Sequence, residues 1–156
     1  LQDYMDADAL AVTLCHELAH GLGGPPYKDN GTTTEGQADY FATKTCLPIF
    51  YNLYKPEMKH TASSGYIEDL CQRENRRSNH KYCIRALNAL HADIGFFKLL
   101  GENSYYDRQA DERPSSYNTS DTFYPSAQCR LDLMIHGVLG LEQPNCFNPQ
   151  GIDRVL

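Results

Sequence analysis

The stretch Leu14-Cys15-His16-Glu17-Leu18-Ala19-His20 contains the pattern H-E-x-x-H. On an α-helix, side chains four residues apart project from the same face, so His16 and His20 would both reach one metal ion. Glu17 lies between them, where its carboxylate can reach a water on that metal without being a ligand itself. The motif therefore predicts a catalytic metal site. The alternative is a helix whose two histidines face solvent or pack against the core.

The residues around the motif favour a helix over positions 7–21. They are rich in helix formers, and Leu10, Leu14 and Leu18 recur at four-residue steps, which predicts that this helix is buried. Three glycines and two prolines within residues 21–26 oppose its continuation beyond the second histidine. We therefore expect the helix to end within about one turn of the metal.

A catalytic zinc site needs a third protein ligand and an open fourth position. Glu35 is the best candidate, because it follows His20 by fifteen residues and opens a second predicted helix over residues 35–46. Asp39 follows Glu35 by four residues and so shares its helix face, where it could accept the second ring N–H of a liganding histidine and fix its tautomer. The alternative is a solvated helix start whose acidic residues are favoured by the helix dipole.

With these residues the chain resembles the gluzincin metallopeptidases, which carry H-E-x-x-H on one helix and a Glu ligand in an E-x-x-x-D pattern on the next. Within that class it is most similar to the CAAX prenyl protease family. The segment Tyr124-Pro-Ser-Ala-Gln-Cys-Arg130 resembles a later motif of the family, in which His-Pro is followed by an arginine six residues after the histidine. The family's histidine stabilises the oxyanion and its arginine supports the site. A phenol can donate the same hydrogen bond, so Tyr124 or Arg130 is the expected oxyanion stabiliser; the alternative for Tyr124 is an aromatic residue packed at a helix entry.

The resemblance implies a zincin-like helical core, Zn²⁺ as cofactor and hydrolysis of a peptide or protein substrate. His16, His20 and Glu35 would hold the metal, and Glu17 would be the general base. The spacing from His20 to Glu35 is much shorter than in the membrane-bound members of the family, which indicates a short soluble variant. Two other functions stay open: a disulfide-braced binding module with a structural or vestigial zinc site, and a zinc amidase acting on a non-peptide substrate such as cell-wall material.

Length and composition fit one domain that is mainly α, with long loops and little or no β-sheet. A chain of 156 residues can bury a single core. It has no apolar run of the length that spans a bilayer, and its net charge of −6 argues against nucleic acid as a partner. Further helices are predicted over residues 66–73, 80–100 and 126–139 from their apolar periodicity.

Six cysteines without a C-x-x-C pair indicate disulfides and an exported protein, periplasmic or extracellular. The alternative is a set of buried free thiols. The segment between the third and fourth cysteines is polar and joins two predicted helices, which favours a bridge across it. A bridge between the last two cysteines could hold the tail, and the remaining pair follows by elimination. The predicted pairs are Cys71–Cys83, Cys129–Cys146 and Cys15–Cys46.

Peptidases of this class lay the substrate as an extra strand along the edge of a small sheet. Only the short run Leu1 to Asp6 precedes the metal helix here, and the chain does not begin with Met. We therefore expect an upstream segment or a companion chain to complete the substrate cleft. Within the chain, the turn Leu22 to Pro26 and the polar loop Glu102 to Tyr124 are the candidate cleft walls.

Overall fold

The computed structural model of the chain describes residues 6–54, 64–73, 80–110 and 124–147. This part of the chain is mainly helical and has no strand, apart from one isolated antiparallel bridge between Tyr27 and Thr33. The prediction of a mainly α fold is therefore confirmed. None of its helices combines the length and the apolar character that crossing a bilayer requires. The helices are α1 (Ala7–Leu22), α2 (Glu35–Phe41), the π-helix η1 (Ala42–Cys46), α3 (Leu47–Leu53), α4 (Gly65–Arg73), α5 (His80–Ala89), α6 (His91–Leu99) and α7 (Ala127–Leu139).

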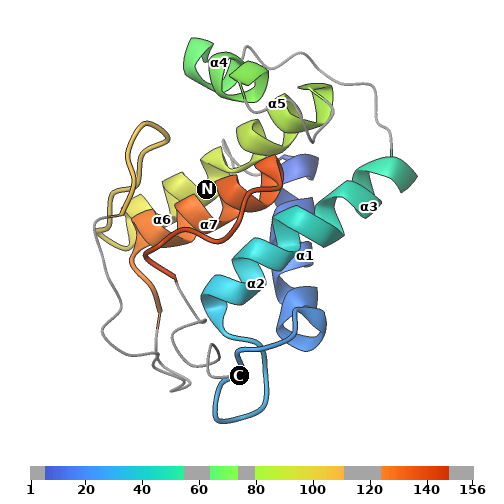
Figure 1. Cartoon of the computed structure of the whole chain (residues 1–156), viewed down its shortest axis with the longest axis vertical. Coiled ribbons are helices and arrows are strands. Elements are labelled where there is room, and N and C mark those ends of the chain that lie inside the picture. The colour runs from blue at the N-terminus through green and yellow to red at the C-terminus, as the bar shows by residue number, and fades with distance from the viewer. Residues whose placement is uncertain (1–5, 55–63, 74–79, 111–123, 148–156) are drawn as a thin grey trace.

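The helices α2, η1 and α3 follow one another as a single rod, drawn in cyan to teal in Figure 1. Helix α1 lies on one side of this rod and α7 on another, so α2 and η1 pack against both. Helices α5 and α6 run alongside α7 and also contact α1. The H-E-x-x-H motif on α1 is thereby brought next to the beginning of α2, and α6 and α7 also contact α1 or α2.

Helix α1 buries a different face from the one that its leucines predicted. Its buried residues are mostly small: Ala9, Ala11, Val12, Cys15 and Ala19. The leucines at positions 10, 14 and 18 are 49%, 49% and 56% exposed, so the prediction that they face the core was wrong. Both stripes of the helix are apolar, and the smaller side chains allow a closer approach to the neighbouring helix, which a disulfide from Cys15 also joins.

Two helix boundaries also differ from the prediction. The helix that begins at Glu35 does not end at Cys46 but continues to Leu53 through the π-helical turn η1. This wider turn comes directly before Pro48, which lacks an N–H and whose ring excludes ordinary α geometry behind it. The predicted helix over residues 80–100 is divided at Leu90, whose N–H bonds to the carbonyl of Leu87 in a tighter turn.

Helices α4 and α7 form where the sequence predicts them. Ser126 caps α7 by accepting the N–H of Cys129, and Gly140 ends it with a φ of 69°, a left-handed conformation that suits glycine. The apolar residues that give α7 its helical periodicity are buried; they are Leu131, Met134, Ile135 and Val138. Helix α7 therefore supplies a large part of the core.

All six cysteines form disulfides, in the three predicted pairs. Cys15–Cys46 joins α1 to η1, Cys71–Cys83 joins α4 to α5, and Cys129–Cys146 joins α7 to the segment after it. The alternative of buried free thiols was wrong. The first of these bridges fixes the metal helix against the helix that carries Glu35.

Candidate metal centre

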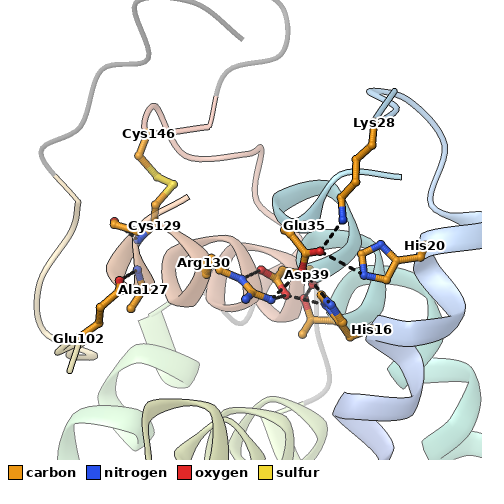
Figure 2. Close-up of polar contacts among 12 residues, drawn as sticks. His16, His20, Lys28, Glu35, Asp39, Glu102, Ala127, Cys129, Arg130 and Cys146 are labelled. Atoms are coloured by element: carbon orange, nitrogen blue, oxygen red, sulfur yellow. Dashed lines mark hydrogen bonds and ion pairs between the residues drawn. A yellow bond between two sulfur atoms is a disulfide. The ribbon is translucent and has the colours of Figure 1, made fainter. Parts of the chain in front are cut away.

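His16, His20 and Glu35 come together between α1 and the beginning of α2 (Figure 2). One ligand atom from each lies within 4.8 Å of the others, so the group could hold a metal ion. Nε2 of His16 is 3.3 Å from Oε2 of Glu35, and Nε2 of His20 is 3.5 Å from Oε1 of the same carboxylate. Both histidines therefore direct the same ring nitrogen at the carboxylate.

The opposite nitrogen of each ring is held by a second residue. Nδ1 of His20 lies 2.8 Å from the carbonyl oxygen of Thr33. A carbonyl can only accept, so Nδ1 carries the proton and a neutral ring has a free lone pair at Nε2. Nδ1 of His16 lies 2.8 Å from Oδ1 of Asp39, in the contact that the four-residue spacing from Glu35 predicts, although its alignment is too poor for a good hydrogen bond. Such partners are typical of metal-binding histidines.

The loop between α1 and α2 places the Thr33 carbonyl. The N–H of Thr33 donates to the carbonyl of His20 over 2.9 Å, and its hydroxyl donates to the carbonyl of Gly24 over 2.9 Å. Gly24 has a φ of 77°, which a residue with a side chain would adopt only with strain. At Gly23 a Cβ atom would meet the carbonyl oxygen of Ala19 at 2.7 Å. The glycines after the motif therefore allow the chain to turn back onto His20.

Cations compensate both acidic residues on α2. Lys28 donates to Oε1 of Glu35 over 2.7 Å, and Arg130 donates to the two carboxylate oxygens of Asp39 over 2.7 and 2.9 Å. Burial opposes ionisation of Glu35, but hydrogen bonds from His16 and Lys28 outweigh it and lower the pKa of the carboxyl to about 2. Burial also opposes ionisation of Asp39, and Arg130 reverses this effect and lowers the pKa. Both groups are thus carboxylates.

The same carboxylates favour the imidazolium form of His16. Burial alone would lower its pKa, but the close contacts with the carboxylates of Asp39 and Glu35 outweigh burial and raise the pKa to about 9. In the metal-free protein a proton on His16 therefore supplies positive charge between the two acids. A metal ion at the same place would take over that role, since a liganding histidine must be neutral.

The remaining predicted residues border one cavity of about 830 Å³ next to the metal group. Glu17 lines it with an exposed side chain, so its carboxylate is accessible to water and substrate. Tyr124 lines it as well and is 56% exposed, with its ring centre 5.8 Å from Nζ of Lys28. Arg130 also reaches the cavity, but its guanidinium is held by Asp39. Arg130 therefore supports the site through the Asp39 carboxylate.

The walls of the cavity differ in part from those predicted. None of the residues of the turn Leu22 to Pro26 lines it, so that expectation was wrong. Most of the predicted loop Glu102 to Tyr124, residues 111–123, lies outside the described residues. Among the residues of that loop that the structure describes, Tyr124 borders the cavity. Helix α6 forms the wall across from α1 instead.

Three residues of the site have no signal in the sequence motifs. Lys28 and the Thr33 carbonyl contact Glu35 and His20 because of the way the loop between α1 and α2 folds. In the sequence, the only indication of these contacts is that the loop lies between the two motifs that carry the ligands. Asp93 on α6 lines the same cavity although it lies 54 residues beyond Asp39 in the chain. Burial raises the pKa of Asp93 to about 7, and the negative charge of Asp39 adds to this rise.

Comparison with family models, with curated proteins and with solved structures found no match to this chain. The Nε2 atoms of the two histidines and one carboxylate converge, and the Nδ1 atom of each ring contacts an oxygen atom that orients the ring. This donor set suits a divalent transition metal and leaves a coordination position for another molecule.

Proposed function

We propose that the chain is an exported, zinc-dependent metalloendopeptidase. The observation that carries the proposal is the paired orientation of His16 and His20, whose Nε2 atoms face Glu35 while Asp39 and the Thr33 carbonyl contact the Nδ1 atoms. Two histidines and one glutamate with oriented rings are the donor set of catalytic zinc sites in peptidases. Zn²⁺ held there would polarise the scissile carbonyl and acidify a water.

The side chains around the cavity can supply the proton transfers and the charge stabilisation. Glu17 would take a proton from the attacking water and deliver it to the leaving amine, and its exposed position in the cavity wall permits both steps. The phenol of Tyr124 would donate a hydrogen bond to the developing oxyanion, worth about 3 kcal/mol when well placed. Arg130 would keep Asp39 ionised and directed at His16.

The test is hydrolysis of an unfolded protein substrate by the zinc-loaded chain and by its Glu17→Gln variant. We expect the variant to bind zinc as the parent does and to lose activity by at least about 100-fold, the usual contribution of a general base. Glu68→Gln is the matched control, because Glu68 is exposed on α4 and does not line the cavity. Metal analysis of each purified protein gives the zinc content.

Other outcomes would select among the alternatives. Zinc binding without cleavage by any of the proteins would favour a structural module, or a chain that needs an upstream segment or companion chain to hold its substrate. Equal activity of the parent and the Glu17→Gln variant would overturn the mechanism. Release of fragments from cell-wall material, with no cleavage of proteins, would indicate a zinc amidase.

The proposal of export rests on the disulfides. Three bridges that include all six cysteines are typical of periplasmic and extracellular proteins and rare in the reducing cytosol. Cleavage in such a compartment would act on exported peptides or proteins. Fractionation of cells that produce the protein, with trapping of free thiols, tests the compartment and the bridges together.

A further inference from the structure

The cavity beside the metal group continues along α6 and becomes more apolar there. Ala92, Phe96 and Leu99 of α6 line it across from Val12 of α1. Phe96 is 45% exposed and Leu99 is 66% exposed, so this wall is open to an incoming chain. The carboxyl group of Asp93 lies within this mainly apolar wall. An apolar channel with one acidic group suits a side chain with an apolar stem and a polar end.

The charges around the cavity are balanced on the metal side and not on the α6 side. Glu35 and Asp39 are compensated by Lys28 and Arg130, through contacts of 2.7 Å each. Asp93, in contrast, has no cation within salt-bridge distance among the residues that the structure describes. Arg130 and His16 act on Asp93 only at longer range, and both side chains already contact Asp39. A positively charged group of a ligand could form the ion pair that Asp93 does not form with the described residues.

Lys98 is the other cationic side chain that lines the cavity. It is exposed, so its ammonium group can remain in water and need not approach Asp93. Glu17 adds a second acidic group at the exposed side of the cavity. Beyond the compensated pairs of the metal side, Asp93 on α6 is the more enclosed of the two acidic residues that line the cavity without a cation in contact among the described residues.

We propose that Asp93 makes this cavity selective for substrates with a positively charged side chain, lysine or arginine, next to the bond that is cleaved. The stem of that side chain packs against Phe96 and Val12, and its cationic end pairs with the Asp93 carboxylate. This inference rests on the proposed peptidase function for its place in catalysis. The pocket itself, however, is a binding site whose preference can be measured without any cleavage.

The first experiment compares the zinc-loaded parent with Asp93→Asn on two peptides that differ only in one residue, arginine or its uncharged counterpart citrulline. Mass spectrometry of a digested unfolded protein first locates the cleavage sites and so the variable position. The parent is expected to favour arginine by about 10- to 100-fold in kcat/KM, the lower part of the range measured for close charge pairs between binding partners. Asp93→Asn is expected to remove the preference, by lowering kcat/KM for the arginine peptide toward the value for the citrulline peptide.

Two further variants keep this experiment decisive. Asp93→Glu retains the charge and should retain a reduced preference for arginine, which a purely structural role of the side chain would not predict. Asp69→Asn on α4 makes the same change of charge at an exposed position outside the cavity and should leave the preference unchanged. Cleavage by the parent with equal kcat/KM for the two peptides would overturn the inference and leave the peptidase function intact.

The second experiment is independent of catalysis. Calorimetric titration of the zinc-loaded chain with n-butylguanidinium and with n-butylurea compares a charged and an uncharged probe of the same shape. The charged probe is expected to bind at least about 10-fold more tightly, and Asp93→Asn to abolish the difference. This result would support the cation site even if the chain shows no peptidase activity, so the two proposals can fail separately. Equal binding of the probes, or the same difference in Asp93→Asn, would overturn the cation site.

Discussion

Asp39 on α2 and Asp93 on α6 border the same cavity, yet their surroundings shift the pKa values of the two carboxyl groups in opposite directions. Asp39 is almost wholly buried and accepts two hydrogen bonds from Arg130, which lower its pKa. Asp93 is partly buried and has no such partner in the described structure, and burial raises its pKa to about 7. The difference shows that a cation in direct contact, and not the extent of burial, decides which of the two carboxyl groups is ionised at neutral pH.

The two sides of the cavity are consequently prepared for different ligands. On the metal side, each acid has its cation and each histidine has its orienting partner before any metal arrives. On the α6 side, Asp93 lies in a mainly apolar wall, and none of the described residues forms an ion pair with it. The first arrangement fixes a coordination geometry, and the second leaves a charge to be satisfied by the substrate.

Removal of Arg130 should have the largest effect on this comparison. Arg130→Met leaves the buried Asp39 carboxylate without its cation, and we expect a loss of about 3 kcal/mol in the free energy of unfolding. Urea unfolding of the metal-free protein at pH 7 measures the loss. Combining Arg130→Met with Asp39→Asn should restore more than half of it, because no uncompensated charge is then buried. An unchanged urea midpoint in Arg130→Met would show that Asp39 does not depend on this cation.

Binding of zinc should displace the proton of His16. With a pKa of about 9 in the metal-free protein, His16 is mostly imidazolium at pH 7.5 and must lose about one proton when it becomes a ligand. Calorimetry of zinc binding in buffers of different ionisation enthalpy gives the number of protons released. Asp39→Asn should release fewer from this group and bind zinc about 10-fold more weakly, because the ring loses its orienting acid. Equal proton release by the parent and by Asp39→Asn would show that Asp39 does not raise the pKa of His16.

The same pKa has a consequence for stability that can be measured without metal. The folded pKa of about 9 lies above the ordinary value of 6.5, so the proton on His16 stabilises the metal-free fold fully below about pH 6.5. That contribution is lost as the pH rises toward 9. Glu35 acts in the other direction, since its lowered pKa stabilises the fold above about pH 4.5 and this contribution is lost as the pH falls toward 2.

The sequence predicted that His16, His20 and Glu35 come together, and the local part of this prediction is the spacing within each helix. The four-residue spacing of His16 and His20, and that of Glu35 and Asp39, fixes two helix faces once the helices form. The disulfide pairs followed from the position of polar segments between predicted helices and from elimination. Helix α7 followed from its cap and its apolar periodicity.

The parts that were missed depend on how helices pack. Both stripes of α1 are apolar, so periodicity could not tell that the side with Cys15 and Ala19 faces the core and that Leu14 does not. The place of Asp93 in the cavity depends on the division of the predicted long helix at Leu90 and on the packing of α6 against α1 and α7. No short pattern in the sequence carries that information.

Asp93→Asn should have the smallest effect on the molecule, and it is the one that distinguishes the two acids most directly. The folded pKa of about 7 lies above the ordinary value of 3.8, so the folded protein keeps a proton that the unfolded chain loses between these pH values. Asp93 therefore destabilises the fold increasingly as the pH rises from about 4 to 7. The Asn variant should be more stable than the parent at pH 8 by on the order of 1 kcal/mol, a figure reduced for partial exposure.

Urea unfolding at pH 4.5 and at pH 8 measures this effect, with Asp69→Asn as the exposed control. A gain of stability at pH 8 that shrinks at pH 4.5, and that Asp69→Asn does not show, is the expected result. A gain of the same size at both pH values would mean that the amide packs better and that the charge of Asp93 is immaterial. If Asp93 binds a cationic substrate, its carboxylate should lower the free energy of unfolding of the free protein, and a cationic ligand should reverse this loss. Residues that serve binding often reduce the stability of the fold in this way.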